Sequence, residues 1–419
     1  MSKIVRVHAR QVLDSRGNPT IQAEIFSQKG FGSAIAPAGA STGSHEAVEL
    51  RDGGSRFNGK GVQNAVALIK SEIHSALRGK EVSNQKAIDS ILCKLDGTKN
   101  KSRLGANSTT AVSISAAKCA ASEKKVSLYR ILGKSFLLPC PFLNVINGGK
   151  HSGSGISIQE FMLVPAGFSS FSEALYAAAE VYHGLGTMIS QKYGRIFLGV
   201  GDEGGFTPPC KSAYEVLTLL EDAVSECGFV GKIKFAIDAA ASSFFQSHTK
   251  AYLLDGKLLS AGQLLDFYSD LASSFPIVSI EDPFEEDSFW DFALLRKKLS
   301  GKVQIVGDDL FVTSISRIQQ GIRASSASAL LLKVNQIGTL SEALEAVALC
   351  RKHNMAVMVS HRSGDSEDSA ISDIAVGIGC GQIKAGAPAR SERTAKYNRL
   401  IQIEEELSGK FAQDKAFRF

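Results

Sequence analysis

Six short, β-prone runs in the last two-thirds of the chain each stop at an ionisable residue. The runs end at Asp238, Glu281, Asp308, Lys333, His361 and Lys384. Successive end points lie 23 to 43 residues apart, about the length that a strand–loop–helix–loop unit needs. This spacing predicts a (β/α) barrel rather than an antiparallel sheet. All six residues would then face one rim, where barrel enzymes carry their active sites.

The first third of the chain has a different pattern. Residues 4–12 and 20–26 are β-prone and flank Gly17-Asn18-Pro19, which predicts a hairpin. The apolar spacing of residues 62–77 predicts an amphipathic helix, and the small apolar residues of 107–123 predict a buried one.

Prolines near 134–141 mark the expected domain boundary. We therefore expect an α/β fold in two parts: a small N-terminal α+β domain at 1–134, which carries a Gly/Ala/Ser-rich loop over 37–44, and a C-terminal (β/α)8 barrel at 135–419.

Composition excludes several classes of protein. The 419 residues are 44% apolar and 21% charged, enough to build a core, and the net charge of +5 comes without a long basic run. No apolar stretch reaches the ~18–20 residues of a membrane span, and the N-terminus lacks the apolar region of a secretory signal. Seven scattered cysteines without a C-x-x-C pair indicate free thiols in a reducing compartment. We expect a cytoplasmic protein that binds neither nucleic acid nor a membrane.

Three of the strand-end residues are carboxylates, Asp238, Glu281 and Asp308. Oxygen ligands from three separate strands, with no Cys or His among them, suit Mg²⁺. The alternative for Asp238 and Asp308 is a helix N-cap, since both precede helical stretches. As a set, the three favour a metal site.

Lys333, in LLLKVNQIG, could act as a general base if burial and nearby cations, a metal pair together with Arg362 and Lys384, lower its pKa towards neutrality. The alternative is a lysine that extends from a strand end to solvent. Glu203 lies in the glycine-rich GDEGGF segment, which could equally be a plain turn, and Glu160 follows Gln159 at the end of a segment that starts near His151. An acid and a base on opposite sides of a metal-bound anion would suit proton abstraction followed by loss of a hydroxyl.

The turn His361-Arg362-Ser363 offers a cation and several hydrogen-bond donors, and Arg362 suits bidentate binding of phosphate or carboxylate. Ser41, in AGASTG, could bind a second metal from a flexible lid, although a plain Ser/Gly linker would look the same.

The chain resembles the enolase (phosphopyruvate hydratase) family over nearly its whole length. The matching stretches occur in family order: LDSRGNPT, GASTGSHEAVELRD, GKGV, LDGTKNKSRLGAN, NVINGGKHSG, IQEFM, VGDEGGF, SIEDPFEEDSFW, VGDDLFVT, LLLKVNQIGTLSEA, SHRSGDSEDS and GQIKAGAPARSER. Three segments are most similar in sequence to archaeal or bacterial members of the family: TAKYNRLIQIEEEL, FAIDAAASS and VGDDLFVT.

The resemblance implies a hydro-lyase of glycolysis and gluconeogenesis that converts 2-phospho-D-glycerate reversibly to phosphoenolpyruvate. By motif, Lys333 would remove the C2 proton, and Glu203 would be the acid for the C3 hydroxyl, with Glu160 beside it. Enzymes of the enolase superfamily are known to pair a Lys or His base with one or two Mg²⁺ ions, so this pairing comes with the resemblance.

Two Mg²⁺ ions are implied, the first held by Asp238, Glu281 and Asp308 and the second by Ser41. The remaining substrate contacts implied are His151, Gln159, Glu160, Lys333, Arg362, Ser363 and Lys384, with His361 lining the catalytic pocket. The implied barrel has the ββαα(βα)6 order, and the implied assembly is a dimer or an octamer of dimers.

The chain departs from the family pattern at few positions. Ala38 stands where Ser is usual, Ser108 replaces an Ala, and Ser243 replaces a Glu. None of these positions has been given a chemical role. Two other functions are considered: another proton-abstraction reaction of the same superfamily, and a non-catalytic or moonlighting scaffold. The lid, GDEGG and SHRSG motifs favour the phosphoglycerate enzyme, because the sibling reactions need no phosphate clamp and a scaffold would have lost site residues.

Overall fold

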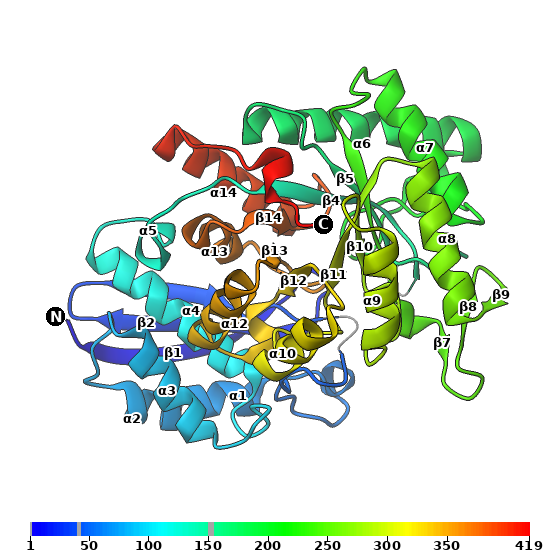
Figure 1. The fold of residues 1–419 in the computed structure, drawn as a ribbon. Coiled ribbons are helices and arrows are strands. Elements are labelled where there is room, and N and C mark those ends of the chain that lie inside the picture. The colour runs from blue at the N-terminus through cyan, green and yellow to red at the C-terminus, as the bar shows by residue number, and fades with distance from the viewer. Residues whose placement is uncertain (1, 40–42, 150–154) are drawn as a thin grey trace.

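A computed structural model describes residues 2–39, 43–149 and 155–419. Two bodies are visible in Figure 1, a small one that contains the N-terminal strands in blue and a larger one built around a barrel.

The smaller body is built on a three-stranded antiparallel sheet, in the order β1-β2-β3. The strands are β1 (Ile4–Leu13), β2 (Pro19–Ser27) and β3 (Phe31–Ile35). β1 and β2 pair in the register Leu13↔Pro19, so the predicted hairpin is confirmed. Sequence reasoning missed β3, a strand of only five residues.

Helices complete the smaller body. They are η1 (Arg56–Gly59), α1 (Gln63–Leu68), η2 (Ile69–Ile73), α2 (His74–Leu77), α3 (Gln85–Asp96), α4 (Ala106–Glu123) and α5 (Tyr129–Leu132). The predicted helix at 62–77 is confirmed as the continuous run α1–η2–α2. Its middle turn, η2, is a π-turn, and Leu77 in the turn that follows is buried.

The predicted buried helix at 107–123 is α4, and it packs between the sheet and the barrel side of the molecule (Figure 1). It contacts β2 and β3 on one side and α11 (Val334–Ile337) and α12 on the other. Gly32 of β3 permits the close approach, because a Cβ there would lie 2.1 Å from the backbone oxygen of Ser115.

The larger body is a closed eight-stranded barrel in the spatial order β10-β11-β12-β13-β14-β4-β5-β6. The strands are β4 (Cys140–Asn147), β5 (Glu160–Val164), β6 (Lys234–Asp238), β10 (Ile277–Glu281), β11 (Gln304–Gly307), β12 (Ala329–Leu332), β13 (Ala356–Ser360) and β14 (Gly381–Lys384). β5 runs antiparallel to both β4 and β6, while the other neighbouring pairs are parallel.

The main outer helices follow the strands in chain order. They are α6 (Phe171–Tyr193), α7 (Ala213–Glu226), α8 (Ala261–Ser274), α9 (Phe289–Lys298), α10 (Ile315–Ala324), α12 (Leu340–Lys352), α13 (Ala370–Ile378) and α14 (Ser391–Leu407). Two strands and two helices therefore precede six strand–helix units. The expected ββαα(βα)6 order and the α/β fold class are confirmed.

Short elements complete the larger body. They are η4 (Arg195–Leu198), η5 (Ala241–Ser243), η6 (Gln413–Ala416) and a small sheet of β7 (Phe245–Gln246), β8 (Ala251–Leu254) and β9 (Lys257–Leu259). Apolar side chains fill the barrel and the space beneath the outer helices, while a second, smaller core lies wholly within residues 4–119.

Candidate active site

The carboxyl ends of the barrel strands bring the predicted residues to one rim. Asp238, Glu281 and Lys384 are the last residues of β6, β10 and β14, and Lys333 and His361 directly follow β12 and β13. The regular spacing of strands along the chain, which predicted the barrel, therefore also brings these side chains together.

Lys384 lies at the centre of an acidic group. Its Nζ is 3.0 Å from Asp238 Oδ2, 2.8 Å from Glu281 Oε1 and 3.2 Å from Glu160 Oε2. Gln159 Nε2 donates a longer hydrogen bond of 3.4 Å to Asp238 Oδ2. Each of these side chains is buried, so the carboxylates compete for one ammonium in a medium that screens charge poorly.

The pKa values of these groups shift accordingly. Burial and the neighbouring Asp238 raise the pKa of Glu281, and burial and Glu203 raise that of Glu160. Burial lowers the pKa of Lys384, but the attraction of Asp238, Glu160 and Glu281 outweighs it, and the net shift is upward. The rim is short of positive charge, which is the condition that a divalent cation would relieve.

Asp308, the next predicted ligand, pairs with the predicted base. Its Oδ2 contacts Lys333 Nζ, and its Oδ1 accepts a 2.9 Å hydrogen bond from Gln336 Nε2. Burial lowers the pKa of Lys333, but the attraction of Asp308 and Glu281 together outweighs it, so the net shift is upward. The expected fall towards neutrality depends on a bound metal pair as well as on burial, Arg362 and Lys384, so it stays a prediction for the metal-bound site.

Neither Asp238 nor Asp308 acts as a helix N-cap, the alternative role considered from the sequence. Asp238 Oδ1 accepts a hydrogen bond from the Ala240 amide at 3.0 Å, which supports a turn, but the N-cap of the following η5 is Ala240 itself. Both oxygens of Asp308 are engaged by side chains rather than by helix amides.

A compact carboxylate cluster adjoins Asp308. Asp282, Asp308 and Asp309 have potential ligand atoms within 4.8 Å of one another. The two oxygens of Asp282 accept the amides of Asp308 and Asp309 at 3.0 and 2.6 Å. Asp282 therefore holds the loop after β11, and this use of its oxygens makes it a poorer ligand candidate than the three strand-end carboxylates.

Arg362 is buried and paired with a residue that sequence reasoning missed. Its Nη1 lies 2.9 Å from Glu46 Oε2, and its Nη2 donates to Glu46 Oε1 at 3.1 Å. Glu46 follows the predicted lid in GASTGSHEAVELRD, so its place in a matching motif was the available signal. Backbone bonds of 2.8 Å in both directions between Ala38 and Gly364 also tie the start of the lid segment to the turn that contains Arg362.

Glu203 and His361 form the other side of the site. Asn144 Nδ2 donates to Glu203 Oε2 at 3.1 Å, and His361 Nε2 lies 3.3 Å from the same oxygen. Burial lowers the pKa of His361 to about 4, although Glu203 acts in the opposite direction. His361 is therefore neutral near pH 7.

The structure places Gln159, Glu160, Glu203, Asp238, Glu281, Asp308, Lys333, His361, Arg362, Ser363 and Lys384 in buried or nearly buried positions of the barrel. Ser41 and His151 lie outside the described residues. With Glu46 included, six carboxylates face three cationic side chains, so this group of described residues has an excess of negative charge.

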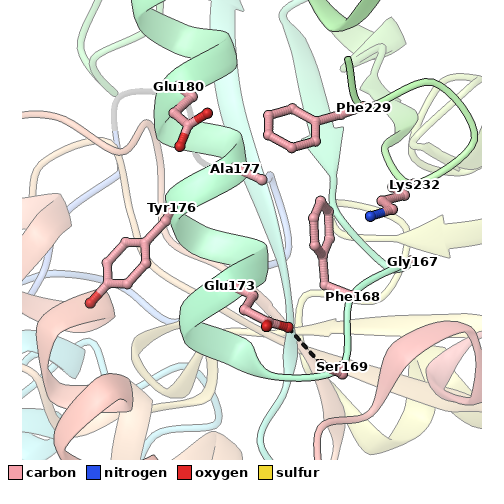
Figure 2. Close-up of a pocket in the computed structure, with 9 residues that line it drawn as sticks. All are labelled: Gly167, Phe168, Ser169, Glu173, Tyr176, Ala177, Glu180, Phe229 and Lys232. Atoms are coloured by element: carbon pink, nitrogen blue, oxygen red, sulfur yellow. Dashed lines mark hydrogen bonds between the residues drawn. The ribbon is translucent and has the colours of Figure 1, made fainter. Parts of the chain in front are cut away.

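A hollow away from this rim is shown in Figure 2. It has a volume of about 560 Å³ and lies beside α6, with Phe168, Phe229 and Lys232 on one side. Glu173 accepts a hydrogen bond from Ser169 there, and Tyr176 points away from the two phenylalanines. None of the predicted site residues lines it.

Comparison with known proteins gives the family. The model "Enolase, N-terminal domain" matches residues 4–132, and "Enolase, C-terminal TIM barrel domain" matches residues 135–417. The chain belongs to the enolase family.

Named enolases from three archaea are similar along almost their whole length. The Methanocaldococcus jannaschii enolase is 52% identical over 408 residues, which cover 97% of this chain and 96% of that protein. The Methanopyrus kandleri enolase is 53% identical over 414 residues (98% and 97%), and that of Pyrococcus furiosus 51% over 411 residues (97% and 96%). The resemblance predicted from sequence motifs is confirmed, as is the enzyme class, a lyase of the phosphopyruvate hydratase type.

Among the described residues, no helix is both long enough and apolar enough to span a membrane. All seven cysteines are free thiols.

Proposed function

We propose that this enolase-family protein catalyses the Mg²⁺-dependent, reversible dehydration of 2-phospho-D-glycerate to phosphoenolpyruvate and water, with Lys333 as the base at C2 and Glu203 as the acid at C3. The observation that carries the proposal is the convergence at one buried rim of a lysine, a protonatable carboxylate and three further strand-end carboxylates.

The reaction needs two proton transfers. Lys333, as the free amine, takes the proton from C2, and the electron pair of the C–H bond is first held as an enolate delocalised into the substrate carboxylate. In a second step that pair forms the C2–C3 double bond as the C3–O bond breaks. Glu203 gives its proton to the departing hydroxyl, which leaves as water. Burial, Arg362 and Lys384 lower the pKa of Lys333, while Asp308 and Glu281 raise it, so the balance among them sets how readily the amine forms.

Glu203 and Glu160 form a pair of buried carboxyl groups. Burial and the neighbouring Glu203 carboxyl raise the pKa of Glu160, so the pair does not readily carry two negative charges. Glu203 Oε2 lies near the donors Asn144 and His361, which stabilise the carboxylate that remains once the proton has gone.

Asp238, Glu281 and Asp308 are proposed as ligands of one Mg²⁺, and Ser41 as a ligand of a second. The donor set fits: the three carboxylates offer only oxygen, and they are buried beside carboxylates whose pKa values are raised for want of positive charge. When bound, Mg²⁺ would stabilise the negative charge that develops at the substrate carboxylate.

The substrate is an anion at both ends, and the proposed binding residues match it. Lys384 and Arg362 supply cations, and Ser363, Gln159 and His151 supply hydrogen-bonding groups, while Glu160 adjoins the acid. Arg362 is held by Glu46 through both Nη atoms, so its guanidinium is fixed in orientation beside the proposed site.

The remaining proposals concern the domain boundaries, the cellular location and the oligomeric state. The separate core within residues 4–119 supports domains at 1–134 and 135–419. Seven free thiols support a cytoplasmic location. A dimer, or an octamer of dimers, is proposed from family membership, and light scattering of the purified protein measures it.

The experiment that tests the function follows phosphoenolpyruvate by its ultraviolet absorbance. Purified protein with saturating 2-phosphoglycerate and Mg²⁺ should form product, and chelation of the metal should stop the reaction. Absence of turnover under these conditions, with a folded protein, would refute the proposal.

A further inference from the structure

A buried arginine outside the predicted site contacts two loops of that site, the loop of Glu203 and the turn after β13. Arg393 is the third residue of α14, and its side chain is fully buried. Its Nη2 donates to the backbone oxygens of Asp202 at 2.9 Å and Ser363 at 2.6 Å, and its Nη1 donates to that of Arg362 at 2.7 Å. Asp202 directly precedes Glu203, so Arg393 fixes the Glu203 loop against the turn that follows β13.

The fold makes room for this side chain. Gly386 has a φ of +87°, and a Cβ at that position would lie 2.7 Å from Cδ of Arg393 and 2.9 Å from the Glu203 backbone oxygen. Only glycine satisfies both the left-handed backbone and the close approach. The GAPARSER segment therefore supplies both the arginine and the space it occupies.

Arg393 also contacts the ring of His361. Its Nη1 lies 2.6 Å from His361 Nδ1, at hydrogen-bond distance. A guanidinium has five N–H donors, no acceptor, and stays protonated in proteins. Nδ1 must therefore present its lone pair, which excludes both the imidazolium and the Nδ1–H tautomer. The single ring proton is on Nε2.

This proton points towards the proposed acid. His361 Nε2 is 3.3 Å from Glu203 Oε2, the oxygen that also accepts from Asn144. The separation is long for a hydrogen bond, and such contacts commonly shorten when a substrate closes the site. Because His361 is neutral, the approach is not an ion pair, and among the described residues Nε2 makes no hydrogen bond in this state of the site.

We infer that Arg393 is a positioning residue that locks His361 as the Nε2–H tautomer, so that His361 acts only as a hydrogen-bond donor to Oε2 of Glu203, and the transferable proton of Glu203 is carried by Oε1. The inference rests on the proposed role of Glu203. His361 then neither gains nor loses a proton in the reaction; it stabilises the carboxylate formed when Glu203 has protonated the leaving hydroxyl.

The charges around His361 agree with this assignment. The groups that act on its ring are Glu203, Arg393 and Asp365, and burial is the largest influence, with a pKa lowered to about 4. Asp365 is itself paired with Lys396 at 2.7 Å, which limits its pull on the imidazole. Neutral His361 is thus the stable form across the pH range in which the reaction would run.

The first test reads the tautomer without any catalysis. Full-length protein labelled with [¹⁵N]histidine gives ring nitrogen shifts and two-bond correlations that distinguish the three protonation forms, and the His361 signal is the one that disappears in His361→Gln. We expect the Nε2–H pattern throughout pH 6 to 8. An Nδ1–H or imidazolium pattern would overturn the inference, even in a fully active enzyme.

The second test uses two amide replacements of His361. Glutamine places an N–H donor near the position of Nε2, whereas asparagine places it near Nδ1. We expect His361→Gln to keep dehydration within about tenfold of the parent and His361→Asn to lose roughly a further 10- to 100-fold in kcat, with C2 proton exchange unchanged between them. Equal rates of dehydration would contradict the donor role.

Arg393 itself is tested by a matched pair. Lysine, like arginine, only donates, so Arg393→Lys should keep the Nε2–H signal, whereas Arg393→Met should allow the Nδ1–H form to appear. If Arg393→Met does not fold, the spectrum of the parent protein still reports the tautomer of His361, and the His361→Gln and His361→Asn variants still test its donor role. If the protein forms no phosphoenolpyruvate, the proposed function fails, while the tautomer measurement still reports on Arg393.

Discussion

Replacing Glu46 with glutamine should destabilise the protein through a buried, unbalanced arginine. The side chains of Arg362 and Glu46 are 2% and 6% exposed, and their two contacts measure 2.9 and 3.1 Å. Breaking a buried pair by removal of one charge costs about 3–5 kcal/mol. Glutamine keeps the volume and one oxygen acceptor, so we expect the lower end, about 3 kcal/mol.

The assay is thermal unfolding with and without an oxyanion. The unfolding midpoint of Glu46→Gln should fall by about 3–5 °C. Inorganic phosphate or phosphoglycerate should then raise the midpoint of the variant more than that of the parent, because the anion supplies the charge that Arg362 has lost.

A matched control separates this effect from the chemistry of the substitution. Glu72 pairs with Arg103 at the same 2.9 Å, but both side chains are more than 40% exposed. Glu72→Gln should change stability by less than about 1 kcal/mol. If Glu46→Gln behaves like Glu72→Gln, with no added response to phosphate, the reasoning about the buried pair is wrong.

Three further outcomes are expected. Gly32→Ala should lose at least about 1–3 kcal/mol of stability in urea unfolding, because its Cβ would meet Ser115. The control Gly262→Ala has open space around it in α8 and should be neutral or gain up to about 1 kcal/mol. Similar changes in the two variants would contradict the close packing at Gly32. Because the folded pKa of His361 is depressed to about 4 from 6.5, its neutral form contributes about 3 kcal/mol above pH 6.5, and this is lost as the pH falls to 4. The stability of the parent should therefore drop more steeply than that of His361→Gln between pH 7 and 4, and parallel curves would refute the assignment. Mg²⁺ at 100 times its Kd should stabilise the parent by about 2.7 kcal/mol in thermal shift but not Asp308→Asn, and an equal shift in both would exclude Asp308 as a ligand.

The positions of the rim residues could be predicted because parallel barrel strands all end on the same side. Asp238, Glu281 and Lys384 each end a run of apolar residues, and the structure brings them within one set of contacts around Lys384 Nζ. Their chemical roles, by contrast, came from resemblance to a family, since spacing alone allowed caps, turns and exposed lysines.

The pairs that bridge distant parts of the chain could not be predicted. Glu46 and Arg362 are separated by 316 residues, and nothing in the local pattern of either indicates the other. Arg393 looks like an ordinary charge at the start of a helix until the loops that it holds are known. The contact of Lys333 with Asp308, which raises the pKa of the lysine, could not be predicted for a related reason, because it depends on the exact course of two loops.

The measurement that tests the central claim most directly is exchange of the C2 proton of 2-phosphoglycerate with deuterium oxide, followed by NMR in two variants. The division of roles predicts that Lys333→Ala abolishes exchange, while Glu203→Gln still exchanges the C2 proton but forms no phosphoenolpyruvate. Equal loss of exchange in both variants, or exchange at the parent rate in Lys333→Ala, would contradict the assignment of base and acid.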